Sequence, residues 1–180
     1  MMKKTLSVVI LAAGVGFALS ASASQFSYDY AEVAYGVRGG GTNVGGDGNM
    51  TLNGSYALKN PKLNAVASFT ANRVARELQA GIGYHKKIMP GTDGLASARL
   101  IKNNGYDIGY ALTAGLRHDF SNDFEGEVSV MFKDSLKANE AGVSETSITA
   151  GSRYHFNREM SAGLGVDDEG RFIFNIRMNY

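Results

Sequence analysis

The last ten residues of the chain, Arg171 to Tyr180, place a large apolar side chain on every second position. These positions are Phe172, Phe174, Ile176, Met178 and Tyr180. A period of two is one face of a β-strand. Chain ends usually fray, so a soluble protein seldom ends on an aromatic residue that needs burial. The pattern therefore predicts a terminal strand that meets lipid and belongs to a closed ring, a membrane β-barrel.

The first 23 residues carry the features of a secretory signal peptide. Lys3 and Lys4 precede an apolar stretch at 6–19, and Ala21 and Ala23 form an A-x-A cleavage site. The apolar stretch is short for a membrane anchor. We therefore expect a signal peptide at 1–23 and an exported barrel domain at 24–180. The chain has no cysteine, which excludes a lipid-anchored lipoprotein and disulfides.

Composition narrows the possible function classes. The formal net charge is +1 for the whole chain, and it becomes −1 once the two lysines of the signal peptide are removed. This balance gives no basic excess for nucleic acid, so no nucleic-acid partner is expected. No later run reaches the roughly 18 apolar residues of a spanning helix. If the chain after 23 spans a membrane, it must do so as a closed barrel, because lipid satisfies no backbone hydrogen bonds.

Alternation of period two predicts ten antiparallel strands in an all-β, up-and-down transmembrane barrel. The predicted strands are 26–35, 50–58, 63–71, 77–88, 95–102, 106–118, 124–133, 146–156, 160–166 and 171–180. Eight strands is the alternative count, and a β-sandwich is the alternative fold, because it also contains alternating strands. An even number of strands places both termini on the same side of the membrane. For an exported chain, that side is the periplasm.

The links between these strands fall into two classes. Short links are expected at 59–62, 89–93, 119–123 and 157–159, and longer links at 39–48, 133–145 and 167–170. Tight periplasmic turns and looser external loops are typical of outer-membrane barrels. The two classes therefore favour a barrel over a sandwich.

Six charged residues are predicted to point into the lumen. They are Glu32, Arg117, Glu125, Glu127, Arg153 and Arg177. One interpretation is an internal plug of ion pairs, since a small barrel is filled by its own side chains and buried charges need partners. The other is a narrow polar pore whose charges select solutes. Arg177 on the last strand is a candidate partner for Glu32 on the first.

A short repeat ends the fourth, sixth and eighth predicted strands. The segments are AGIGYH at 80–85, AGLRH at 114–118 and AGSRYH at 150–155, and each ends in a histidine. A metal site would need the three side chains within a few ångströms of one ion. Alternate strands lie roughly 10 Å apart, so a polar ring at the membrane boundary is the favoured interpretation. His118 follows its Ala-Gly one residue sooner than the others, which predicts that it points outward.

Several short motifs resemble a known family. They are YDYAEVAY at 28–35, GSYAL at 54–58, GIGYH at 81–85 and GYALTAGLR at 109–117. They are similar to patterns of small Gram-negative outer-membrane barrels of the Ax-twenty-one type, and they spread over most of the chain after 23. The resemblance implies an exported outer-membrane barrel with no established catalytic residues to transfer. Neither a metal nor a cofactor is expected.

The resemblance also has implications for partners. The alternation at 172–180 looks like the C-terminal signal read by the outer-membrane insertion machinery, with Tyr180 in place of the commoner phenylalanine. The expected partners are that machinery, periplasmic chaperones, and the lipid and lipopolysaccharide of the outer membrane.

Three functions are compatible with the sequence. The leading hypothesis is a structural or surface-interaction barrel with a packed lumen, and the second is a narrow porin-like channel for small polar solutes. The third is a barrel enzyme acting on lipid or peptide, like omptin-like proteases. Ser129 and Ser152 are candidate nucleophiles, but neither lies in a G-x-S-x-G motif. We therefore expect no enzymatic activity.

Overall fold

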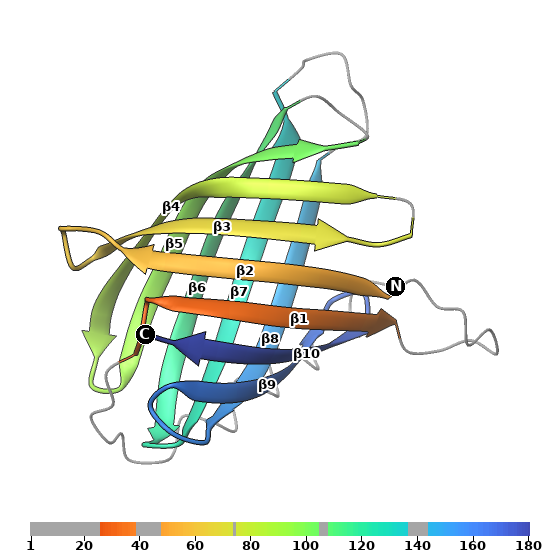
Figure 1. Cartoon of the computed structure of the whole chain (residues 1–180). Helices are drawn as coiled ribbons and strands as arrows, with labels where there is room; N and C mark the ends of the chain where they lie inside the picture. Colours follow the sequence, from red (N-terminus) through yellow and green to blue (C-terminus); the bar gives the residue numbers. More distant parts are fainter. Residues whose placement is uncertain (1–25, 39–47, 74, 105–107, 137–143) are drawn as a thin grey trace.

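The computed structural model of the chain describes residues 26–38, 48–73, 75–104, 108–136 and 144–180, and within them ten strands form one closed antiparallel barrel (Figure 1). The strands are β1 (Tyr30–Arg38), β2 (Asn49–Ala57), β3 (Leu63–Ala71), β4 (Arg76–Met89), β5 (Thr92–Asn103), β6 (Gly109–Ser121), β7 (Phe124–Ser135), β8 (Glu145–His155), β9 (Met160–Asp167) and β10 (Arg171–Asn179). The predicted signal peptide, most of the predicted link 39–48 and much of 133–145 lie outside the described residues.

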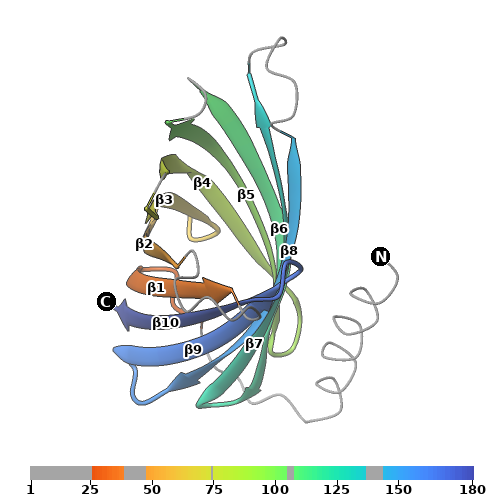
Figure 2. The ribbon, with the colours of Figure 1, turned by 90° about the vertical axis from the view of Figure 1, so that its right-hand side faces the viewer.

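Each strand pairs with its neighbours in sequence, and β1 pairs with β10 to close the ring. This topology confirms the up-and-down barrel and the count of ten, and it rules out the eight-stranded alternative and the sandwich. Figures 1 and 2 show the strands inclined to one another around the ring, with β7 and β8 on the wall opposite β1 and β2.

The start of the first strand was predicted wrongly. β1 begins at Tyr30 rather than residue 26, because Phe26 and Tyr28 make contacts inside the lumen. The sixth strand was also misplaced, since β6 begins at Gly109 and runs on to Ser121. Its pairing with β7 continues through a register irregularity between Asp119 and Ser121, so strand geometry persists beyond the predicted turn.

The two ends of the barrel differ. Tyr30 pairs with Asn179, so the start of β1 and the end of β10 lie side by side at one end, here called the turn end (Figure 1). The turns after β2, β4, β6 and β8 lie at this end. In the turn after β4, Gly91 adopts a φ of 70°, a conformation that favours glycine. The opposite end is here called the loop end. The even strand count thus places both ends of the described chain together.

The outer face of the barrel is apolar. Phe172, Phe174, Ile176, Met178 and Tyr180 are all exposed, as the alternation of the last strand requires. Exposed leucine, isoleucine, valine and aromatic side chains continue around the other strands. A belt this large is what lipid covers on a membrane barrel. No helix of the described chain is long and apolar enough to cross a membrane.

The inner face has the opposite character. The buried apolar residues among those described are Ala34, Ile101 and Ala111. Thirteen polar or charged residues of the described ranges are buried, which inverts the usual arrangement of a soluble protein. They are Glu32, Ser55, Asn64, Ser68, Gln79, Thr92, Asp93, Arg117, Asp119, Glu125, Arg153, Ser161 and Arg177. The polar side chains available for a functional site therefore lie inside the barrel.

The assignment of the two faces can be tested with one substitution at two positions of β10. Ile176→Lys places a charge on the outer face, where Ile176 is 57% exposed, and should destabilise the barrel in lipid vesicles by about 2–4 kcal/mol if it lies near the bilayer midplane. Ile173→Lys on the inner face should cost clearly less. Urea titration followed by gel mobility without boiling measures both. Equal losses for the two variants would show that the faces are assigned wrongly.

Candidate functional site

The seam that closes the barrel carries the first buried ion pair. Glu32 on β1 lies opposite Arg177 on β10 in the strand register. Arg177 Nε donates to Glu32 Oε2 at 2.9 Å, and Nη2 lies 2.8 Å from the same oxygen. The guanidinium of Arg177 also stacks over the Tyr30 ring at 3.8 Å. The pair predicted from the sequence across this seam is therefore formed.

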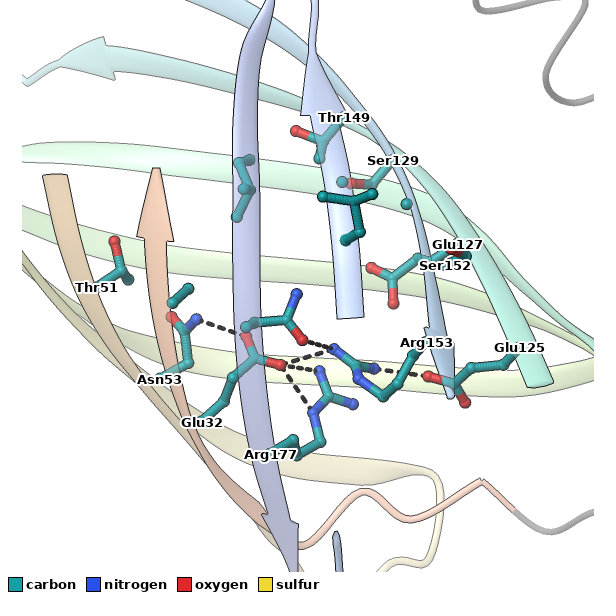
Figure 3. Close-up of a pocket in the computed structure, with 16 residues that line it drawn as sticks. Glu32, Thr51, Asn53, Glu125, Glu127, Ser129, Thr149, Ser152, Arg153 and Arg177 are labelled. Atoms are coloured by element: carbon teal, nitrogen blue, oxygen red, sulfur yellow. Dashed lines mark hydrogen bonds and ion pairs between the residues drawn. The ribbon is translucent and has the colours of Figure 1, made fainter. Parts of the chain in front are cut away.

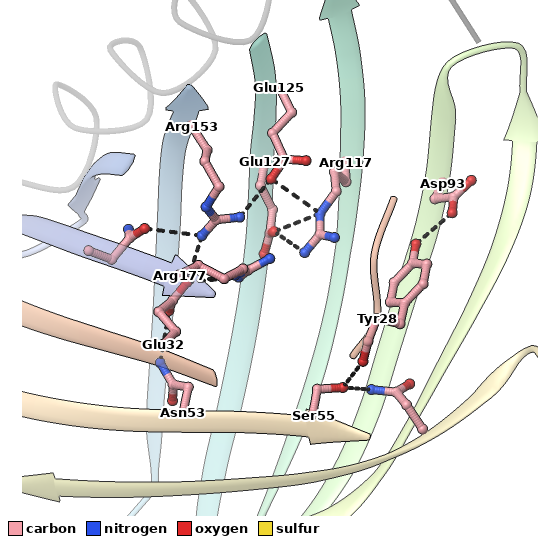
Figure 4. A network of polar contacts seen from close by, with 12 residues as sticks. Tyr28, Glu32, Asn53, Ser55, Asp93, Arg117, Glu125, Glu127, Arg153 and Arg177 are labelled. Atoms are coloured by element: carbon pink, nitrogen blue, oxygen red, sulfur yellow. Dashed lines mark hydrogen bonds and ion pairs between the residues drawn. The ribbon is translucent and has the colours of Figure 1, made fainter. Parts of the chain in front are cut away.

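Arg153 on β8 links the seam to the next wall of the lumen. Its Nη2 donates to Glu32 Oε2 at 2.7 Å, and its Nη1 donates to Glu125 Oε1 on β7 at 2.6 Å. Figure 4 shows Arg153 between these two carboxylates, and its Nη2 also donates to Asn175 Oδ1 at 3.1 Å. One guanidinium thus joins two carboxylates that are far apart in the sequence, because its planar group presents several hydrogen-bond donors at once.

Arg117 on β6 extends the contacts to a third carboxylate. Its Nε and Nη2 donate to Glu127 Oε2 at 3.2 and 3.0 Å, and its Nε lies 4.0 Å from Glu125 Oε1. The order of contact is Arg177, Glu32, Arg153, Glu125, Arg117 and Glu127. We call these six residues the arginine–glutamate chain. The structure brings together all six residues that the sequence placed in the lumen.

The arginine–glutamate chain alternates in charge and is formally neutral. Five of its side chains are buried, with exposed fractions between 4% and 9%. Buried charges are tolerated only when they are paired, so each internal member has a partner on both sides. Glu127 differs, because its side chain is 36% exposed. The arginine–glutamate chain therefore ends on one accessible carboxylate, that of Glu127.

A cavity of about 260 Å³ lies beside the arginine–glutamate chain (Figure 3). Glu32, Glu125, Glu127, Arg153 and Arg177 line one part of it. The cavity extends along β1, β2 and β7–β10 toward the loop end, where hydroxyl and amide side chains replace the charges. These are Thr51, Asn53, Ser129, Thr149 and Asn175. Such a lining offers donors and acceptors to a small polar molecule.

The wall formed by β3–β6 carries a second set of polar contacts. Lys133 on β7 donates to Glu77 Oε1 at 2.9 Å, which joins β7 to β4 across the lumen. Arg99 Nη1 donates to Gln79 Oε1 at 3.2 Å, and Gln79 donates in turn to Glu77 Oε1 at 2.6 Å. The six charged residues predicted for the lumen include none of these. Glu77 and Arg99 lie in phase with inward residues of their strands, so the same alternation could have found them.

The residues that precede β1 fill the turn end of the lumen. Tyr28 Oη donates to Asp93 Oδ2 at 2.5 Å, and the Tyr28 ring stacks on His85 with centroids 3.3 Å apart. Ser55 Oγ donates to the Tyr28 carbonyl at 2.6 Å (Figure 4). The Arg117 guanidinium lies 5.4 Å from the Phe26 ring and 5.5 Å from the Tyr28 ring. We call residues 26–29 the N-terminal plug, because they close this part of the lumen.

Sequence reasoning missed the N-terminal plug. The alternation of YDYAEVAY continues smoothly from Tyr28 into β1, so periodicity alone gives no sign that the chain turns inward. Burial, and then the hydrogen bond to Asp93, raise the pKa of the Tyr28 phenol well above its ordinary range. The phenol therefore stays protonated and continues to donate to Asp93 at neutral and moderately alkaline pH.

The three histidines end in different surroundings. His85 stacks on Tyr28 and His155 Nε2 lies 3.3 Å from Glu125 Oε2, so both face the lumen rather than an outer ring. His118 points the other way, as predicted: it packs edge-on against Phe120 and its Nδ1 lies 2.7 Å from Thr92 Oγ1. Within the described ranges, no three histidine, cysteine or acidic side chains are grouped to hold a metal.

The offset of His118 has a backbone cause. The N–H groups of His85 and His155 donate to the carbonyls of Lys62 and Asp123 in the preceding turns, at 3.0 and 2.8 Å. In β6 the equivalent bond comes from Asp119, one residue later, and runs to Gly91 at 2.8 Å. Because side chains alternate along a strand, a shift of one residue turns His118 to the opposite face.

Removal of the shared carboxylate should destabilise the barrel strongly. Glu32→Gln removes the negative partner of Arg177 and one of the two carboxylate partners of Arg153 in a buried site. This loss should lower the free energy of unfolding by about 3–5 kcal/mol. The chain has no tryptophan, so circular dichroism during urea titration is the suitable measurement. The control is Glu169→Gln, which breaks an exposed pair with Arg171 and should cost less than about 1 kcal/mol. Similar costs for both would contradict the role given to Glu32.

The N-terminal plug should depend on the Tyr28 hydroxyl. Tyr28→Phe keeps the ring stack but leaves the buried Asp93 carboxylate without that donor, for an expected loss of about 1–3 kcal/mol. The same titration measures it. Tyr56→Phe on the outer face is the matched control, with little change expected because Tyr56 is exposed. If both variants unfold at the same urea concentration, the Tyr28 hydroxyl does not hold the plug.

Comparison with solved structures supports the fold. The chain is similar to the KdgM porin, with 9% sequence identity, a TM-score of 0.57 and coverage of 84% of this chain and 99% of that one. A structure of the KdgM porin in complex with disordered oligogalacturonate matches at 9% identity over the same shares, with a TM-score of 0.54. The NanC porin matches at 11% identity and a TM-score of 0.51, covering 83% of this chain and 98% of that one.

Sequence comparison adds no family assignment. No protein-family model matches the chain, and no curated protein matches it. The resemblance to barrels of the Ax-twenty-one type therefore stays a prediction. At identities near 10% the structural likeness establishes the fold alone: a closed ten-stranded barrel of the kind found in small outer-membrane porins.

Proposed function

We propose that this protein is an integral outer-membrane β-barrel that acts as a narrow porin-like channel for small polar solutes. The observation that carries the proposal is the polar cavity of about 260 Å³ inside the lumen. It extends from the loop end to the arginine–glutamate chain, so a solute would meet hydroxyl and amide groups first and charges afterwards. The apolar outer face supports placement in lipid.

The chemistry of the lining suits small hydrophilic molecules. Thr51, Asn53 and Thr149 present neutral hydrogen-bonding groups, which can replace part of the hydration shell of a solute. The arginine–glutamate chain forms the narrow part, because its ion pairs link β10, β1, β8, β7 and β6 across the lumen. Passage would therefore be limited to small solutes that slip past these side chains.

The structural neighbours favour a channel over a purely structural role. KdgM and NanC are both named porins, and one KdgM structure holds oligogalacturonate. We propose an outer-membrane location for this barrel on the same basis. The turn end would face the periplasm, and the terminal strand with Phe172, Phe174, Ile176, Met178 and Tyr180 would serve as the signal for the insertion machinery. Periplasmic chaperones, lipid and lipopolysaccharide are the further proposed partners.

A structural or surface-interaction barrel is the second candidate. Two observations favour it: ion pairs cross the lumen, and the N-terminal plug occupies part of the turn end. In this case the cavity would hold only water, and the loop end would provide the interaction surface.

An enzymatic role has less support. Ser129 and Ser152 both line the cavity, but no histidine lies among its lining residues. A serine nucleophile needs a base within hydrogen-bond reach. The neighbours named porins agree with a barrel that performs no chemistry.

Planar-bilayer recording separates the first two candidates. The channel proposal expects discrete, reproducible conductance steps from the purified barrel in KCl. Tyr28→Ala should raise the conductance, because it removes the ring that stacks on His85 in the N-terminal plug. Tyr56→Ala, on the outer face, is the control that should leave it unchanged. A folded, inserted barrel without conductance in either form would refute the channel and favour the structural role.

A further inference from the structure

We infer that the Glu127 carboxylate makes the lumen selective for cations, so that small cationic solutes are the class the channel prefers. This inference rests on the proposed channel function. It concerns which charge passes, whereas the proposal above concerns whether anything passes. The argument depends on which charges in the cavity a solute can reach.

Among the described residues, five charged side chains line the cavity, and four of them are shielded. Glu32, Glu125, Arg153 and Arg177 have exposed side-chain fractions of 4–9%. Each is also held by at least one ion pair of 2.9 Å or less. Glu127 is 36% exposed, so it is the lining charge that a solute in this cavity meets directly.

The hydrogen bonds of Glu127 leave one of its oxygens available. Both hydrogen bonds from Arg117 end on Oε2, at distances of 3.2 and 3.0 Å. Arg117 itself is buried, with a side-chain exposed fraction of 5%, and it is not among the residues that line the cavity. Oε1 can therefore contact a cation directly or accept a hydrogen bond from the water of its hydration shell.

Three other described basic groups, Arg99, Lys133 and Arg171, lie outside the cavity lining. Arg99 is not part of the lining; its Nη1 donates to Gln79, and its Nε is buried. Lys133 is paired with Glu77 at 2.9 Å. At the loop end, Arg171 is shared by Asp167 and Glu169, at 3.1 and 3.0 Å. Glu127 is therefore the charged residue of the cavity lining that is most accessible to a solute.

The size of the effect follows from Coulomb's law. A unit charge about 6 Å from a passing ion in water changes the local concentration of that ion about threefold. The change has opposite signs for a cation and an anion, so the ratio of their permeabilities can change about tenfold. Salt screens an accessible charge, which means that the preference should be strongest at low ionic strength.

The experiment measures reversal potentials of the full barrel in a planar bilayer under a KCl gradient. The unsubstituted protein should prefer K⁺ over Cl⁻. Glu127→Gln should lower the K⁺/Cl⁻ permeability ratio about three- to tenfold, as expected for the loss of one accessible charge. Glu127→Asp should retain most of the preference. Glu159→Gln is the matched control, because this exposed carboxylate lies in the turn after β8, outside the cavity, and should leave the ratio unchanged.

Each other outcome has a distinct meaning. Anion preference of the unsubstituted protein overturns this inference whether or not the variants fold. It is also overturned if Glu127→Gln conducts with an unchanged ratio, or if Arg99→Gln changes the ratio more than Glu127→Gln does. Absence of any conductance from the inserted barrel refutes the proposed channel, and the cation preference with it. Conductance without selectivity refutes only the role of Glu127.

Discussion

Closure of the sheet is the constraint on which the rest of this structure depends. An open strand edge leaves a row of backbone groups unpaired, and in lipid no water can satisfy them. The ring closes where β1 meets β10, so the first and last strands become neighbours. Glu32 and Arg177 face each other at this seam, and the ion pair between them adds a specific contact to the backbone pairing.

Closure also decides the character of the interior. Because alternate side chains point to opposite faces, the apolar belt on the outside leaves polar residues for the lumen. Charges in such a confined space must be paired, and three arginines alternate with three glutamates across it. The same ion pairs therefore stabilise the wall and narrow the passage. This dual effect is why a channel and a structural role both have support from one set of residues.

Few of the charged residues in the lumen are accessible to a solute. Most of the arginine–glutamate chain is shielded, and the N-terminal plug covers part of the turn end. Glu125 is 4% exposed and holds Arg153, whereas Glu127 two residues away on the same strand is open to the cavity. Position in the network, rather than residue type, thus separates a structural carboxylate from one that a solute can meet.

The sequence by itself determined the barrel, the strand count and the inward or outward direction of most side chains, because a period of two is a local property that survives folding. It also predicted the lumen residues and the pairing of Glu32 with Arg177. Three further points follow only from the tertiary structure: Phe26 and Tyr28 turn into the lumen, His85 and His155 face inward instead of forming an outer ring, and Glu127 alone of the six stays accessible. These points depend on contacts between distant strands, and alternation along a single strand carries no information about such contacts.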